Sequence, residues 1–262
     1  TAPYERLTAL LGEACKAKFE AYNDARKEIL IAMKNLRTEE DAAWAEQLES
    51  IQNTKAEDLF YNIWCDMYSN IAYANNVLEH LEKFSPADMQ FYNIYKGEAL
   101  GLRAFMHFDL LRIFSEQITV NESADGIPYS TRFSLFAPDI LKSKDVYKRI
   151  ISDLRSAEQL LDDEELYASA SSNANFLKKQ NFHFNLQAVQ ATLARVYLTE
   201  GTLDSALYYA QQVIQAPGLS LLDYTDIAGD LAGKLSSKET VFGIYSKNFA
   251  EPVIKILHNS QT

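Results

Sequence analysis

The stretch that decides the fold is GEALGLRAFMHFDLLRIFSE, residues 97–116. Its apolar residues recur at intervals of three and four and no proline interrupts them, which predicts one unbroken α-helix. Gly97 and Gly101 lie four residues apart on one stripe, so another backbone can approach closely there. Leucine, methionine and isoleucine cover a second stripe, and the helix is therefore apolar around most of its circumference.

Arg103 stands in the middle of this apolar helix. The narrow polar face consists of Glu98, Asp109 and Arg112, and Arg103 and His107 point roughly opposite to it. Arginine is almost never buried without a partner. We therefore expect Arg103 to be partly buried and to join helix layers, with its N–H groups donating to carbonyls or to a carboxylate. Contact with a ligand is the alternative.

The composition limits the classes of partner. Of 262 residues, 47% are hydrophobic, which is enough for a substantial core, and the net charge is −11. That charge argues against a nucleic-acid partner and against a polybasic contact with an anionic membrane. The 15 tyrosines and 14 phenylalanines indicate large side chains filling a helical core, with some available to stack on carbohydrate.

Two cysteines and the first residues bear on processing. Cys15 and Cys65 are expected to be two buried thiols, and a single disulfide is the alternative. No run of about 18 apolar residues occurs, so no membrane-spanning helix is expected. The chain starts at TAPYERL without a methionine, which is typical of a processed or trimmed form.

Helical periodicity dominates the chain. It predicts one long helix or two over 4–36 and a helix over 55–84. A further helix is capped by Ser85, with Pro86 at its first position and Asp88 in its first turn, and another covers 143–163, capped by Ser143 with Asp145 in its first turn. Long ordered loops are expected over 117–142 and 165–183. Beyond Pro217 the pattern changes to short pieces, and ETVFGIYS, residues 239–246, is the best candidate for a strand.

Residues 187–217 fit the tetratricopeptide pattern of two packed helices. Small residues let the two helices approach, Tyr197 is expected to fill the gap to the next helix pair, and a glycine lies near the turn. The residues that carry the pattern are Ala194, Tyr197, Gly201, Ala206, Ala210 and Pro217. The other helices fit such a repeat only loosely.

The fold class predicted is mainly all-α, with tetratricopeptide-like helical repeats, long ordered loops and a short irregular or β part at the C-terminal end. Residues 1–220 are expected to form the helical region and residues 221–262 the start of the irregular region.

The sequence contains no recognisable catalytic motif. The four histidines lack a His or Glu partner at metal-ligand spacing, and no nucleophile elbow, dinucleotide loop or phosphate loop occurs. The acidic runs TEED and LDDEEL are typical of solvated helix ends. We therefore expect no catalytic residue, no metal, no cofactor and no enzymatic activity.

Several blocks in sequence order resemble the SusD/RagB family, the outer-membrane nutrient-binding lipoproteins of Bacteroidetes. The resemblance covers roughly residues 60–245. The blocks are IWCDMYSNIAYANNVLEHLE, GEALGLRAFMHFDLLRIF, DGIPY, SKDVYKRIISDLRSAEQLL and FNLQAVQATLARVYLTEGTLDSALYYAQQVI.

The resemblance implies a tetratricopeptide-like scaffold held at the cell surface by an N-terminal lipid. Such a protein works beside a SusC-like TonB-dependent transporter and captures an oligosaccharide, or in some members a peptide, without breaking a bond. The lipid-bearing cysteine is absent from this chain, because Cys15 lies too deep in a predicted helix. The chain also stops where family members continue, so much of the C-terminal half is expected to be missing.

Ligand contacts cannot be carried over by motif, because they lie in variable loops. The candidates are aromatic residues in or beside predicted loops, and packing is the alternative for each: Trp44, Tyr129, Tyr167 and Phe176. The rival function is a tetratricopeptide-type interaction scaffold, or a peptide-binding RagB-like variant, and glycan hydrolysis is a weaker third possibility.

Overall fold

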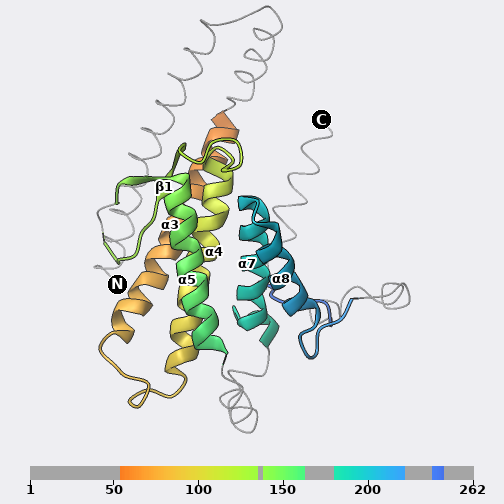
Figure 1. The fold of residues 1–262 in the computed structure, drawn as a ribbon. Helices are drawn as coiled ribbons and strands as arrows, with labels where there is room; N and C mark the ends of the chain where they lie inside the picture. Colours follow the sequence, from red (N-terminus) through yellow and green to blue (C-terminus); the bar gives the residue numbers. More distant parts are fainter. Residues whose placement is uncertain (1–53, 135–137, 163–179, 222–237, 245–262) are drawn as a thin grey trace, which may run out of the picture. The chain divides into compact units, whose positions relative to one another are not determined.

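The computed structural model describes residues 54–134, 138–162, 180–221 and 238–244 (Figure 1). Cys15, Trp44, Tyr167 and Phe176 lie outside these residues, so the two alternatives for Cys15 and Cys65 stay predictions. The chain divides into two compact units, Thr1–Ser156 and Ala157–Thr262. The boundary predicted at residue 220 falls inside the second unit and also stays a prediction. The mainly helical fold class is confirmed.

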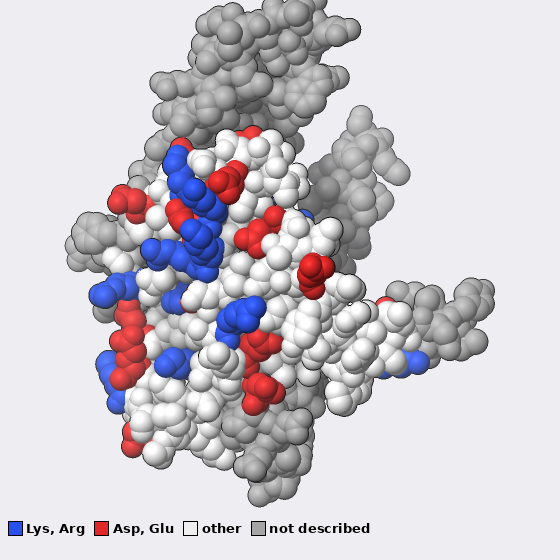
Figure 2. Space-filling view, in the orientation of Figure 1, with Lys and Arg blue, Asp and Glu red and all other residues white. Residues whose placement is uncertain are grey.

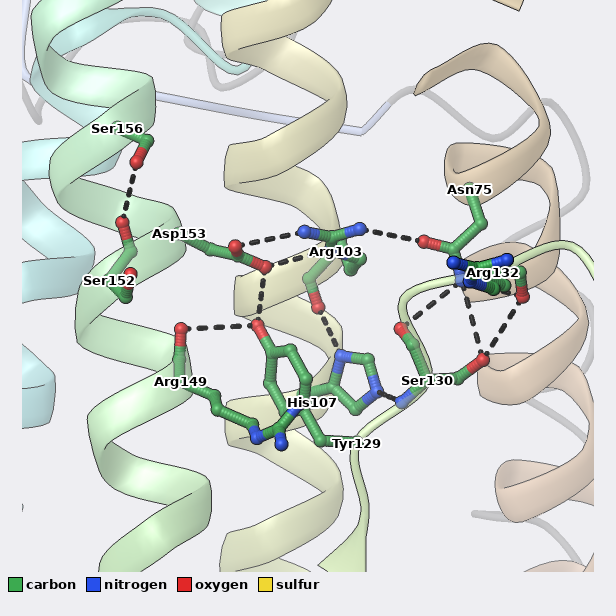
Figure 3. A network of polar contacts seen from close by, with 10 residues as sticks. All are labelled: Asn75, Arg103, His107, Tyr129, Ser130, Arg132, Arg149, Ser152, Asp153 and Ser156. Carbon is green, nitrogen blue, oxygen red and sulfur yellow. Dashed lines mark hydrogen bonds and ion pairs between the residues drawn. The ribbon is translucent and has the colours of Figure 1, made fainter. Parts of the chain in front are cut away.

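The first unit contains α3 (Thr54–Leu81), α4 (Tyr92–Phe114) and most of α5 (Ser143–Leu161). Figure 3 shows α4 between the other two helices. Aromatic rings join the layers: Trp64 of α3 meets Phe114 edge to face at 4.8 Å, and Phe108 of α4 meets Tyr147 at 6.3 Å. The core is therefore built from the large side chains that the composition predicts.

Two short strands connect α4 to α5. Strand β1 (Asp125–Pro128) pairs antiparallel with β2 (Ile140–Lys142), which leads directly into α5. A Cβ atom at Gly126 would lie 3.0 Å from both the Leu141 carbonyl oxygen and a Val146 methyl group, so only glycine fits there without a shift. The pairing of the two strands holds together the two ends of the loop that connects them.

The start of α4 differs from the prediction. Ser85 donates from its N–H and its hydroxyl to Asp88 at 2.9 and 2.6 Å, but these residues form a turn and the helix begins only at Tyr92. Phe91 intervenes with a φ of 63°, in the left-handed region, so the chain changes direction before helical geometry starts. Ser143 does begin α5, yet its hydroxyl bonds Ser115 instead of capping the helix.

The second unit contains the end of α5, a short 3₁₀ turn (Gln180–Phe182), α7 (Leu186–Glu200) and α8 (Leu203–Ile214). Asn185 caps α7 by accepting from the N–H of Ala188 at 2.8 Å. The two helices pack as the predicted hairpin. Ala206 is buried, while Ala194 and Ala210 are half-buried.

Tyr197 stacks on Tyr209 within its own hairpin, with ring centroids 5.8 Å apart. Its expected contact with a further helix pair stays a prediction. The strand expected over 239–246 is wrong for the described residues. Residues 238–244 form no strand. Their polar groups bond to the turn before α7 instead of to a neighbouring strand: the Val241 carbonyl accepts from Asn185, and Gly243 donates to the Asn181 carbonyl. Phe242 packs edge to face on Phe184.

None of the helices in the described part of the chain is long and apolar enough to cross a bilayer.

Gly201 ends α7 with a φ of 91°, and its N–H and that of Thr202 donate to the last turn of the helix. We predict that Gly201→Val lowers the free energy of unfolding by about 2 kcal/mol, because a β-branched residue is strained at this φ. Gly201→Asn should cost less than half as much, since asparagine tolerates the left-handed region. Urea denaturation measures both, and equal losses would contradict this explanation.

Candidate functional site

A buried ion pair joins α4 to α5. Arg103 donates from Nε and Nη2 to the two carboxylate oxygens of Asp153 at 2.7 and 2.9 Å (Figure 3). The two side chains are only 9% and 15% exposed. Burial acts to lower the pKa of Arg103, but the hydrogen bonds and negative charge of Asp153 outweigh it and the pKa lies above its ordinary value. Arg103 therefore joins helix layers, as the sequence predicts.

Asn75 extends this pair to α3. Its side-chain oxygen accepts from Arg103 Nη1 at 2.9 Å, and its amide nitrogen donates to the carbonyls of Ser130 and Arg132 at 3.1 and 3.2 Å. Asn75 is completely buried. One side chain thus connects the ion pair to the loop that follows β1.

His107 holds the same loop from α4. Its Nε2 atom accepts from the N–H of Ser130 at 3.0 Å, so the ring proton resides on Nδ1, which donates to the Arg103 carbonyl at 2.8 Å. Burial lowers the pKa of His107 to about 3, and the nearby positive charge of Arg103 acts in the same direction. Both ring nitrogens are occupied, which leaves neither for a ligand.

Tyr129 packs on His107, with ring centroids 3.9 Å apart and the planes 20° from parallel. Its hydroxyl donates to Asp153 at 2.6 Å. Burial and the charge of Asp153 raise the pKa of Tyr129 well above its ordinary value, so the hydroxyl stays protonated. Because the residue is only 3% exposed, it offers no ring face to a sugar. The structure supports the packing alternative for Tyr129, and we do not propose it as a ligand contact.

Helix side chains also fix the ends of the loop through its backbone. The Tyr68 hydroxyl donates to the Pro128 carbonyl at 2.7 Å, and Glu79 accepts from the N–H of Phe133 at 2.8 Å. Together with the bonds from Asn75 and His107, these contacts fix the segment 128–133, which we call the anchored loop. In the part of the chain that the structure describes, every buried side-chain nitrogen and oxygen has a hydrogen-bond partner.

Two members of this network, Asp153 and Asn75, were not predicted, although the sequence contains a signal for them. Asp153 lies on the same helical stripe as Val146, Ile150 and Ala157, all of which are buried, and Asn75 follows Ile71 by four residues. A polar residue on an apolar stripe indicates a buried partner.

Gly97 and Gly101 of the opening stretch are buried in α4, beside which α3 packs. The close approach of another backbone at these two glycines stays a prediction.

We predict that Asp153→Asn lowers the free energy of unfolding by about 3 kcal/mol, because it leaves the buried guanidinium of Arg103 without a counter-charge. The control is Asp109→Asn, which removes a partly exposed pair with Arg112 at 3.6 Å and should cost at most about 1 kcal/mol. Chemical denaturation at neutral pH measures both. Equal losses of unfolding free energy in the two variants would show that the buried pair stabilises the protein no more than the Asp109–Arg112 pair.

We predict that His107 makes the protein less stable in acid. The unfolded chain takes up a proton on this histidine near pH 6.5, whereas the folded protein does so only near pH 3. Stability is therefore fully present above pH 6.5 and falls by about 1.4 kcal/mol per pH unit down to about pH 3. His107→Gln should remove about 2 kcal/mol of the loss between pH 6.5 and pH 5.

The control for this pH dependence is His80→Gln. His80 makes the same bond to the carbonyl four residues earlier, at 2.8 Å, but is exposed. If both variants lose stability in acid as steeply as the parent protein, His107 is not the responsible group.

Comparison with known proteins agrees with this fold. A family model described as starch-binding and associating with the outer membrane matches residues 7–198. A SusD-like protein of Formosa agariphila is 32% identical over 106 residues, which cover 38% of this chain and 18% of that protein.

Solved structures are similar as well. A SusD superfamily protein from Bacteroides thetaiotaomicron is 28% identical with a TM-score of 0.53, over 63% of this chain and 34% of that one. A SusD-like carbohydrate-binding protein from Bacteroides vulgatus shares the fold at 21% identity, with a TM-score of 0.57 over 71% and 37% of the two chains.

The chain thus spans about a third of the solved structures that it matches and a fifth of the curated relative. The family model nevertheless covers most of this chain, from the first predicted helix nearly to the end of α7. The chain belongs to the SusD-like family, whose members are described as starch-binding and as associating with the outer membrane.

Proposed function

We propose that this protein binds an oligosaccharide or polysaccharide at the outer face of the outer membrane and delivers it to a SusC-like TonB-dependent transporter. The observation that carries the proposal is the match of residues 7–198 to a family of starch-binding, outer-membrane-associated proteins. A lipid at the N-terminus of the precursor would hold the protein at the cell surface. Membrane contact through this lipid alone agrees with the charge of −11, which disfavours a polybasic contact.

Binding without catalysis is supported by the buried polar network. Its ionisable members, Arg103, His107, Tyr129 and Asp153, are all committed to bonds that hold helices and the anchored loop together. Among the described residues, no three His, Cys, Asp or Glu side chains gather in a way that would hold a metal ion. We propose that affinity comes from aromatic faces stacked on sugar rings, and Trp44, Tyr167 and Phe176 remain the proposed contacts.

A polypeptide ligand is the second candidate, and one surface favours it. Leu203, Leu207 and Ile214 lie on one stripe of α8 and are 63%, 58% and 64% exposed. Exposed apolar stripes of this kind are typical of protein contact sites. The scaffold function predicts that a partner chain covers this stripe.

We predict that the full chain is retarded in native gels containing one of a set of polysaccharides, among them amylopectin and laminarin. Changing Trp44, Tyr167 or Phe176 to alanine should weaken binding about tenfold for each true contact, equivalent to about 1.4 kcal/mol. The control is Tyr208→Ala, which removes an aromatic ring that is 55% exposed on α8.

Retardation that is lost with the proposed contacts and kept in Tyr208→Ala would support glycan capture. Absence of retardation by every glycan, together with peptide binding that is lost in Leu207→Lys, would replace glycan capture with the scaffold function.

A further inference from the structure

The anchored loop has the properties of a recognition surface. Its backbone is bonded by side chains from α3 and α4, while the side chains of Thr131 and Arg132 are exposed. Binding residues are commonly displayed on loops that a rigid scaffold positions. A loop that is already fixed loses little conformational entropy when a ligand binds, so more of the contact energy appears as affinity.

Two arginines belong to this loop or lie beside it. Arg132 belongs to it, and its carbonyl is bonded by Asn75 of α3. Arg149 lies on α5, where its backbone carbonyl is 3.5 Å from the Tyr129 hydroxyl. Figure 3 shows Arg149 and Arg132 on either side of Tyr129 and Ser130. Both arginines are exposed.

These two arginines differ from the other basic side chains nearby. Figure 2 shows Lys and Arg gathered over the N-terminal part of α5 with acidic side chains beside them. There Lys144 pairs with Glu122 at 4.0 Å and Lys148 with Asp145 at 3.1 Å. Within the described residues, by contrast, neither Arg132 nor Arg149 has a carboxylate within 4.0 Å of its guanidinium.

Unbalanced positive charge is unexpected in this chain. Acidic residues outnumber basic ones by 36 to 25, so carboxylates that could pair with an arginine are abundant in the chain. Two guanidinium groups that lack a counter-charge among the described residues, beside a loop held in one conformation, complement an anionic ligand. A guanidinium binds a carboxylate through two parallel N–H bonds, and the Thr131 hydroxyl can exchange hydrogen bonds with sugar hydroxyls.

We propose that the anchored loop and Arg149 form a binding surface for a glycan that carries carboxylate groups, with Arg132 and Arg149 each pairing with a sugar carboxylate. This inference rests on the proposed function, since it names the class of glycan that the protein takes. It adds to the aromatic candidates two charged residues that no sequence motif indicates.

The test is binding of the full chain to polygalacturonate, with amylopectin as the neutral glycan and dextran sulfate as the sulfated one. Arg132→Ala and Arg149→Ala should each weaken binding to polygalacturonate about tenfold, and raising sodium chloride from about 50 to about 500 mM should weaken it further. The matched control is Arg112→Ala, because Arg112 is exposed and paired with Asp109 in the same unit. Circular dichroism verifies that the variants are folded.

The outcomes separate this inference from the proposed function. Tight binding to polygalacturonate that is lost in both variants and kept in Arg112→Ala supports it. Binding to amylopectin alone, unchanged in Arg132→Ala and Arg149→Ala, overturns the acidic-glycan site and leaves glycan capture standing. Equal binding to dextran sulfate and polygalacturonate shows attraction to any polyanion and overturns the carboxylate site. Binding to none of the glycans overturns both proposals.

Discussion

The ion pair between Arg103 and Asp153 is the interaction on which the first unit depends. Two charged groups in an apolar interior are tolerated only if their bonds are complete, because either charge alone would be costly to bury. Here the pair is bidentate, Asn75 takes a further guanidinium N–H, and the Tyr129 hydroxyl donates to the carboxylate. A shift of α4 by one turn relative to α3 would break the bond to Asn75, and a shift relative to α5 would break the two bonds to Asp153. The hydrogen bonds around Arg103 and Asp153 therefore favour one alignment of the three helices. Apolar packing alone would discriminate less strongly between alternative alignments.

Much of this architecture follows from the sequence, and the exceptions have physical reasons. Periodicity locates the helices, and the position of Arg103 on an apolar helix correctly indicates buried hydrogen bonds. Local sequence signals predict the wrong structure where contacts with residues distant in the sequence determine the conformation. The turn at Ser85 has a good capping pair, yet Phe91 redirects the chain before α4 begins. Residues 239–244 are rich in β-formers, but their backbone groups bond to the turn before α7. Tyr129 lies in a predicted loop and is nevertheless buried, with its ring stacked on His107.

In the candidate site the buried polar groups hold the structure together, whereas the exposed groups form its surface. His107 and Asp153 resemble catalytic residues in type, but their protons and lone pairs are used to hold structure. Sequence patterns do not identify Arg132, Arg149 or the anchored loop as a binding surface. The position of the loop and the exposure of the two arginines depend on how the helices pack. A binding protein needs this arrangement: a core that does not respond to ligand and a surface whose geometry it fixes. Membership of the SusD-like family agrees with such a role.

The anchored loop is bonded mainly through its peptide groups, and peptide groups are the same in every amino acid except proline. Asn75 and His107 therefore hold positions 130–132 with little regard to which exposed side chains stand at 131 and 132. The side chains at positions 131 and 132 can therefore be changed without removing the bonds that hold the loop. Exchanging these two side chains, by mutation in nature or by grafting in the laboratory, would change the surface that the loop presents while keeping the bonds that hold its backbone.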